Sequence, residues 1–264
     1  MNFYFFLDLK TEGLLSSVEI FNRPSIEKLT KGYKGDLFMK AFYSFKNKWH
    51  FHNLGKISKN NNLILNKTEL PNDFRDKSVF ISMSKNEKFN ENLLIDEKEI
   101  LNTQPEWRSN LKISSSFTST SYQGEYPYSM TKRKLSLTSC SPMLQSGKNI
   151  KNFFFLVNLK EKPEIKEFEL KLLKINKKEI DNFYLKTNSV NVIEIDQELI
   201  NYYDKKNNNF FIFKSSDEGG IPIYFTKSND LKMMSLEHTH PPTAYYLFGN
   251  SFAFQKRKKN FWSK

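Results

Sequence analysis

Short stretches in which apolar and polar residues alternate recur along this chain of 264 residues. Residues 78–84 read SVFISMS and place Val79, Ile81 and Met83 on one side of an extended strand. Residues 134–138 (KLSLT) alternate in the same way. Because turn residues separate such stretches and no 3.6-residue period is sustained, the pattern predicts an all-β sandwich or barrel with few short helices.

Other segments extend this interpretation. Further strands are predicted at 14–21, 37–45, 168–175 and 221–225, short helices at 24–30 and 96–104, and a hairpin turn at 60–62.

Two pairs of segments resemble each other in the same order along the chain. Residues 3–10 (FYFFLDLK) and 153–160 (FFFLVNLK) each read as a strand buried on both faces. Residues 63–84 and 192–215 each give a short strand, a Glu-Leu pair, an aromatic turn and a strong strand. The pattern predicts two tandem β-sandwich units, immunoglobulin-like or jelly-roll-like, related by internal duplication.

The composition of the segments suggests where these units end. Residues 141–149 (SPMLQSGKN), with their proline and glycine, are the best candidate for a linker. The predicted divisions are a first sandwich at 1–146 with an aromatic and polar insertion near 104–143, a second sandwich at 150–255, and a basic tail at 256–264.

The chain carries a net charge of +12, which has two interpretations. A basic surface indicates an anionic partner such as nucleic acid or an anionic glycan. The abundance of Lys, Asn, Ile and Phe together is also typical of an AT-rich genome. The tail at 256–264 holds five cations and no acid, so most of the excess lies elsewhere.

The single cysteine, Cys140, excludes an intramolecular disulfide, and its surroundings favour a buried or incidental thiol. The first residues lack a cationic segment and a cleavage site, and their apolar run is too short to cross a bilayer. We therefore expect a cytoplasmic protein without a membrane span.

The four histidines form two pairs with one residue between the partners, His50 with His52 and His238 with His240. On a strand, such partners point to the same side and can offer two imidazoles to a divalent metal. His238 and His240 are the preferred metal ligands because Glu237 lies beside them, whereas lysines precede the first pair. Ordinary strand positions without metal are the alternative.

Two tyrosine-rich segments are candidates for ligand binding, because aromatic rings stack on sugars and neighbouring polar groups fix the hydroxyls. Packed loops or structural corners between strands are the alternative. The candidate residues are Tyr122, Gln123, Glu125, Tyr126 and Tyr128 in the first segment, and Glu237, Tyr245 and Tyr246 in the second.

No phosphate-binding loop, nucleophile elbow or paired-cysteine motif is present in the sequence. The sequence is interpreted as a non-enzymatic binding or assembly protein that recognises a glycan or other polar ligand through an aromatic surface. One alternative is a metal-dependent enzyme using His238 and His240. Another is a protein that binds nucleic acid or another anionic polymer through its basic surface.

Overall fold

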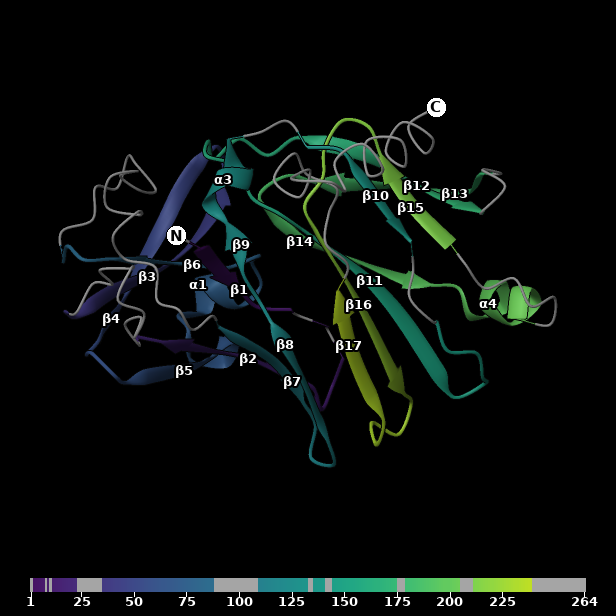
Figure 1. Cartoon of the computed structure of the whole chain (residues 1–264), viewed down its shortest axis with the longest axis horizontal. Helices are drawn as coiled ribbons and strands as arrows, with labels where there is room; N and C mark the ends of the chain where they lie inside the picture. Colours follow the sequence, from purple (N-terminus) through teal and green to yellow (C-terminus); the bar gives the residue numbers. More distant parts are fainter. Residues whose placement is uncertain are drawn as a thin grey trace, which may run out of the picture. The chain divides into compact units, whose positions relative to one another are not determined.

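A computed structural model describes residues 2–7, 9, 11–22, 35–87, 109–132, 135–140, 144–174, 179–204 and 211–238 (Figure 1). The chain divides into two compact units. The first contains Met1–Lys132 and Lys160–Ile165, and the second contains Arg133–Leu159 and Lys166–Lys264. Each unit is a β-sandwich of two antiparallel sheets, which confirms the predicted all-β architecture.

The first unit pairs a five-stranded sheet with a four-stranded sheet. The larger sheet has the order β4-β3-β6-β1-β9 and is built from β1 (Asn2–Phe5), β3 (Leu37–Phe45), β4 (Lys48–Ile57), β6 (Phe80–Ser84) and β9 (Tyr126–Pro127). The smaller sheet has the order β5-β2-β7-β8 and is built from β2 (Leu15–Phe21), β5 (Asn62–Asn66), β7 (Asn110–Ser114) and β8 (Ser119–Gln123). Short helical turns lie at η1 (Lys67–Glu69), α1 (Asn72–Arg75) and α3 (Tyr128–Thr131).

The apolar residues of β2, β5 and β7 line up across the smaller sheet. Val18 pairs with Leu65 on one side and with Leu111 on the other, and all three are buried. The larger sheet is buried more completely, since Phe3 to Leu7 are all buried. Burying such large side chains supplies most of the free energy that favours folding.

The second unit has two four-stranded sheets. One has the order β10-β15-β12-β13 and is built from β10 (Leu137–Cys140), β12 (Glu167–Lys174), β13 (Glu179–Lys186) and β15 (Phe211–Ser215). The other has the order β14-β11-β16-β17 and is built from β11 (Ile150–Asn158), β14 (Ser189–Ile195), β16 (Ile221–Ser228) and β17 (Met234–His238). Helix α4 (Gln197–Asp204) connects β14 to β15.

Aromatic rings from both sheets form the centre of the second core. Phe154 of β11 stacks on Phe213 of β15 with ring centroids 3.9 Å apart and planes 6° apart. Leu144 also belongs to this core and is 5% exposed. Residues 144–149 are therefore part of the second unit, and the interpretation of 141–149 as a linker is wrong for this part of the segment.

The two units share one strand order. When β1 to β8 are replaced in chain order by β10 to β17, the order β4-β3-β6-β1 becomes β13-β12-β15-β10, and β5-β2-β7-β8 becomes β14-β11-β16-β17. A helical segment also connects the fifth strand to the sixth in both units, η1 with α1 in the first and α4 in the second. The common order agrees with the predicted duplication, which itself stays a prediction.

Only one of the two pairs of similar segments matches this strand order. Residues 63–84 and 192–215 cover equivalent segments, from β5 to β6 and from β14 to β15. The pairing of 3–10 with 153–160 is wrong, because β1 is equivalent to β10 and β11 is equivalent to β2. Both segments are buried on both faces, so each reads as a continuous apolar run whatever its place in the sandwich.

The predicted strand at 37–45 coincides with β3. A turn is present at 60–62, since Asn60 has a φ of 66° between β4 and β5, but the prediction of a hairpin is wrong because these two strands belong to different sheets. The helices predicted at 24–30 and 96–104 lie outside the described residues.

Candidate functional site

The predicted ligand residues at 122–128 do not share one exposed face. Tyr122 pairs with Leu111 and shares its side of the sheet, whereas the neighbouring Gln123 is exposed on the opposite side. Tyr126 is fully buried, so its ring is not available to stack on a sugar from solvent.

Tyr128 and Glu125 also interact with buried residues of the first unit. Tyr128 is 7% exposed, lies 6.2 Å from the ring of Phe3, and donates a hydrogen bond of 3.3 Å to Glu161 Oε1. Burial, and secondarily the charge of Glu125, raise the pKa of the Tyr4 hydroxyl far above its ordinary value. These contacts agree with the packed-loop alternative for this segment.

The second predicted segment is described only at its beginning. Glu237 is exposed on β17 and pairs with Tyr224, and His238 ends this strand opposite Ile223. His240, Tyr245 and Tyr246 lie outside the described residues. Within the described part of the chain, no three His, Cys, Asp or Glu side chains come together in a way that could hold a metal ion.

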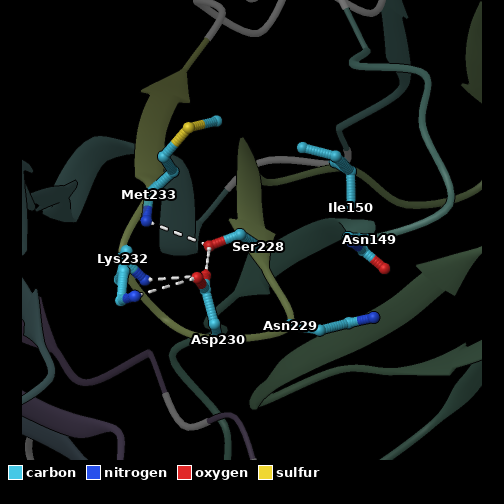
Figure 2. A pocket seen from close by; sticks show the side chains of 7 residues that line it. All are labelled: Asn149, Ile150, Ser228, Asn229, Asp230, Lys232 and Met233. Carbon is cyan, nitrogen blue, oxygen red and sulfur yellow. Dashed lines mark hydrogen bonds and ion pairs between the residues drawn. The ribbon is translucent and has the colours of Figure 1, made fainter.

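An open hollow of about 560 Å³ lies beside the turn between β16 and β17. Figure 2 shows its lining, in which the Asp230 carboxylate points toward Ser228 and Lys232. Asp230 Oδ1 accepts a 2.6 Å bond from Ser228 Oγ and a 3.2 Å bond from the Lys232 amide. The lining residues are Asn149, Ile150, Ser228, Asn229, Asp230, Lys232 and Met233.

The chemistry of this hollow suits binding of a polar molecule. The Ser228 hydroxyl and the Lys232 amide, as hydrogen-bond donors, lower the pKa of Asp230, which keeps it ionised at neutral pH. Ser228 Oγ donates to this carboxylate and accepts a 3.0 Å bond from the Met233 amide. Both interactions hold the hydroxyl within the turn, and the described lining of the hollow includes no histidine to activate it.

A second candidate surface lies on the hairpin of β3 and β4 (Figure 1). Its two-residue turn consists of Lys46 and Asn47, whose φ angles are 50° and 59°. Positive φ at both positions is the conformation that best matches the twist of a tight hairpin. Asn is common there, whereas Lys is not, so the hairpin keeps a lysine at its tip despite an unfavourable backbone conformation.

Lysines surround an exposed phenyl ring at this tip. Phe45 is 41% exposed, and the Nζ atoms of Lys46 and Lys77 lie 5.3 Å and 5.1 Å from its ring centroid. Lys48 pairs with Phe45 across the hairpin, and the imidazole of His50 lies 6.0 Å from the phenyl ring. We call Phe45, Lys46, Lys48, His50 and Lys77 the Phe45 surface.

A rigid layer of aromatic side chains supports the Phe45 surface. His50 stacks on Tyr43 with ring centroids 5.1 Å apart and planes 12° apart, and Phe74 of α1 meets Tyr43 edge-on at 4.8 Å. Tyr43 also donates a 3.5 Å hydrogen bond to Asp73. Burial and the Asp73 carboxylate raise the pKa of Tyr43, which therefore stays neutral at physiological pH.

Several lysines of the described sheets are paired with carboxylates, whereas others, such as Lys112 and Lys186, have no described ion pair. Lys56 binds Asp36 at 2.7 Å, Lys151 binds Glu194 at 2.7 Å, and Lys171 binds Glu179 at 2.9 Å. Lys46, Lys48 and Lys77, by contrast, form no ion pair with any described residue. Their positive charge is therefore open to an external anion.

The histidine pair on this hairpin behaves as its spacing predicts. His50 and His52 point to the same side of β4, where His50 lies on Tyr43 and His52 lies 5.8 Å from Phe74. In the sequence, the neighbouring lysines indicate only that this pair is unfavourable for a metal. Lys46 and Lys48 lie next to Phe45 and other aromatic residues in the sequence. This mixture of basic and aromatic residues was the signal that could have indicated an anion-binding surface.

Comparison with protein-family models, with curated proteins and with solved structures finds no match. Among the described residues, no helix has the length and apolar character needed to cross a membrane. Function is therefore inferred from the hollow beside β16 and β17 and from the Phe45 surface.

Proposed function

We propose that this protein is a non-enzymatic binding protein for a polyanionic ligand, and that the Phe45 surface carries the binding. The supporting observation is that Lys46 and Lys48 of one hairpin and Lys77, which follows α1, lie around Phe45 and have no described ion-pair partner. Like charges held together destabilise a folded protein, and a bound polyanion removes this repulsion and releases counterions.

The positions of the lysines favour a chain of charges over a single ion. Lys46 lies in the turn, Lys48 begins β4, and Lys77 follows α1, so the cations come from three segments around one ring. The Asp73 carboxylate accepts a hydrogen bond from Tyr43, and Asp76 is exposed beside Lys77 in the chain. Three lysines against these two carboxylates leave the surface with a small net positive charge.

Binding to fluorescein-labelled heparin, followed by fluorescence anisotropy at several salt concentrations, tests this proposal. The combined variant Lys46→Gln, Lys48→Gln and Lys77→Gln should weaken binding and flatten its salt dependence. A matched control carries the same loss of charge at three exposed lysines elsewhere, Lys59→Gln, Lys112→Gln and Lys186→Gln. Equal weakening in both variants would show that the overall charge of +12 attracts the polymer without a dedicated surface.

The hollow beside β16 and β17 supports a second candidate function, the binding of a glycan. The hollow combines polar and apolar groups. The polar groups are the ionised carboxylate of Asp230 and the amides of Asn149 and Asn229, and the apolar ones are the side chains of Ile150 and Met233. Carboxylates and amides bind sugar hydroxyls, and apolar side chains cover the C–H face of the ring.

Calorimetric titration against a panel of neutral oligosaccharides tests this second candidate. The variant Asp230→Ala should abolish binding, whereas Asp181→Ala, which removes an exposed carboxylate of β13, should leave it unchanged. Binding that survives Asp230→Ala would remove the hollow as the site.

A further inference from the structure

We infer that the polyanion bound by the Phe45 surface is a single-stranded nucleic acid; this inference rests on the proposed function above. Lysines alone would serve any polyanion, so the distinguishing feature is the phenyl ring between them. Phe45 remains 41% exposed, although burying such a ring is normally favourable. A ligand that supplies a flat apolar surface together with negative charge would use both parts of the site.

An unpaired nucleotide supplies both. Its base presents a π face that stacks on aromatic side chains, and its phosphate pairs with lysine, which is how proteins hold single strands without reading their sequence. In a duplex, the base faces are covered by their neighbours, so a stacking ring finds no free face and only the phosphates and base edges remain available. The Phe45 surface should therefore prefer single strands to duplexes of the same length.

The geometry around the ring fits this role. The two ammonium groups lie over the ring of Phe45, 5.3 Å and 5.1 Å from its centroid, so a stacking base would displace them and its phosphates would take them as partners. His50 offers a second ring 6.0 Å from the first, inclined at 63°, and its stacking on Tyr43 fixes its orientation. Because the phenyl ring of Phe45 stacks on any base without hydrogen-bonding to its edge, we expect little sequence preference.

The test measures anisotropy of a fluorescein-labelled oligothymidine, a duplex of equal length and labelled heparin. For the wild-type chain, the single strand should bind more tightly than the duplex, and the logarithm of the binding constant should fall with the logarithm of salt with a slope of about −2, as three neutralised phosphates would give. Phe45→Ala should weaken binding of oligothymidine about tenfold, which is within the range measured for stacking of one base. Binding of heparin should change less than about twofold, because salt-dependent phosphate or sulfate pairing does not need the ring.

The chain offers a matched control for the ring. Phe117, in the turn between β7 and β8, is 67% exposed, and Phe117→Ala removes a more accessible phenyl without touching the Phe45 surface. This control variant should bind oligothymidine like the wild type, and Phe45→Trp should retain or strengthen binding because it restores a stacking surface.

The outcomes separate the two proposals. If neither heparin nor oligothymidine binds, the proposed function fails. Heparin binding together with equal binding of the duplex and the single strand would mean that the ligand is an anionic polymer recognised by charge alone. The same conclusion follows if Phe45→Ala weakens the binding of heparin and the binding of oligothymidine equally. The inference about single strands is then overturned while the proposed function stands.

Discussion

The buried amide of Asn152 holds together three segments of the second unit, and replacing it provides a quantitative test of the fold. Its side chain is fully buried in β11. Nδ2 donates to Gln145 O at 2.8 Å and to Gln197 Oε1 at 3.0 Å. Oδ1 accepts from the Gln145 amide at 3.1 Å and from Thr226 Oγ1 at 2.8 Å. All four hydrogen-bonding positions of the amide are thus occupied.

The variant Asn152→Ala removes these four bonds and leaves their partners without the amide. At a net contribution of ~1 kcal/mol per hydrogen bond, the upper value of the loss is ~4 kcal/mol. Gln145 is exposed, so water replaces part of its bonding. We therefore expect the free energy of unfolding of the second unit to fall by about 3 kcal/mol.

Urea unfolding followed by far-ultraviolet circular dichroism measures this loss, and hydrogen exchange with mass spectrometry locates it. Protection should fall in residues 144–149 and in α4, because Gln197 and the neighbouring Asn201 continue the same network to Gln145 and Gly147. The control is Asn182→Ala, which removes one 2.8 Å bond to Glu169 on the face of β13. A loss below about 1 kcal/mol for Asn152→Ala, or equal losses in the two variants, would refute the reasoning.

Three further predictions concern single positions. Gly220→Ala should destabilise the second unit more than Gly55→Ala in chemical unfolding, because a Cβ at Gly220 would overlap the carbonyl oxygen of Val157, whereas Gly55 has open space and only a φ of +84° to maintain. The pKa of Asp230 is lowered in the folded state. The stability that its carboxylate contributes is therefore present above the unfolded pKa and is lost as pH falls through the folded pKa. In the variant Asp230→Asn, the free energy of unfolding should consequently fall less between neutral and strongly acidic pH than it does in the wild type. If His238 and His240 hold a divalent metal, elemental analysis of the purified chain should find a metal whose content falls when both are replaced by alanine; metal content that does not depend on these residues would end that interpretation.

The sequence predicts strands best where their two faces differ. In β12, Phe168, Leu170 and Leu172 lie in the core, while Glu169 and Lys171 between them form polar contacts on the other face. Alternation of this kind predicts both that the segment is a strand and which of its faces lies in the core. β1 and β11 carry no such information because both faces are buried, and their similar sequences led to a false correspondence.

Residues that depend on distant partners could not be placed from the sequence. Tyr128 looked like part of an exposed patch, but its contacts are with Phe3 and with Glu161, far along the chain in both directions. The Phe45 surface likewise needs Lys77, which α1 brings to the ring only in the folded unit. Local patterns describe one segment at a time, whereas these sites are made where segments meet.

The common strand order of the two units allows the Phe45 surface to be compared with its topological equivalent. The hairpin of β12 and β13 is the counterpart of the hairpin of β3 and β4. On that hairpin, Lys171 lies 2.9 Å from Glu179 and 3.7 Å from Glu169, so its charge is neutralised internally. Lys171 lies within the strands, opposite Asn182, and residues 175–178 at the tip of this hairpin lie outside the described residues. Lys171 thus has acidic partners within its own sheet, and the proposed binding of a polyanion rests on the side chains of the first unit alone.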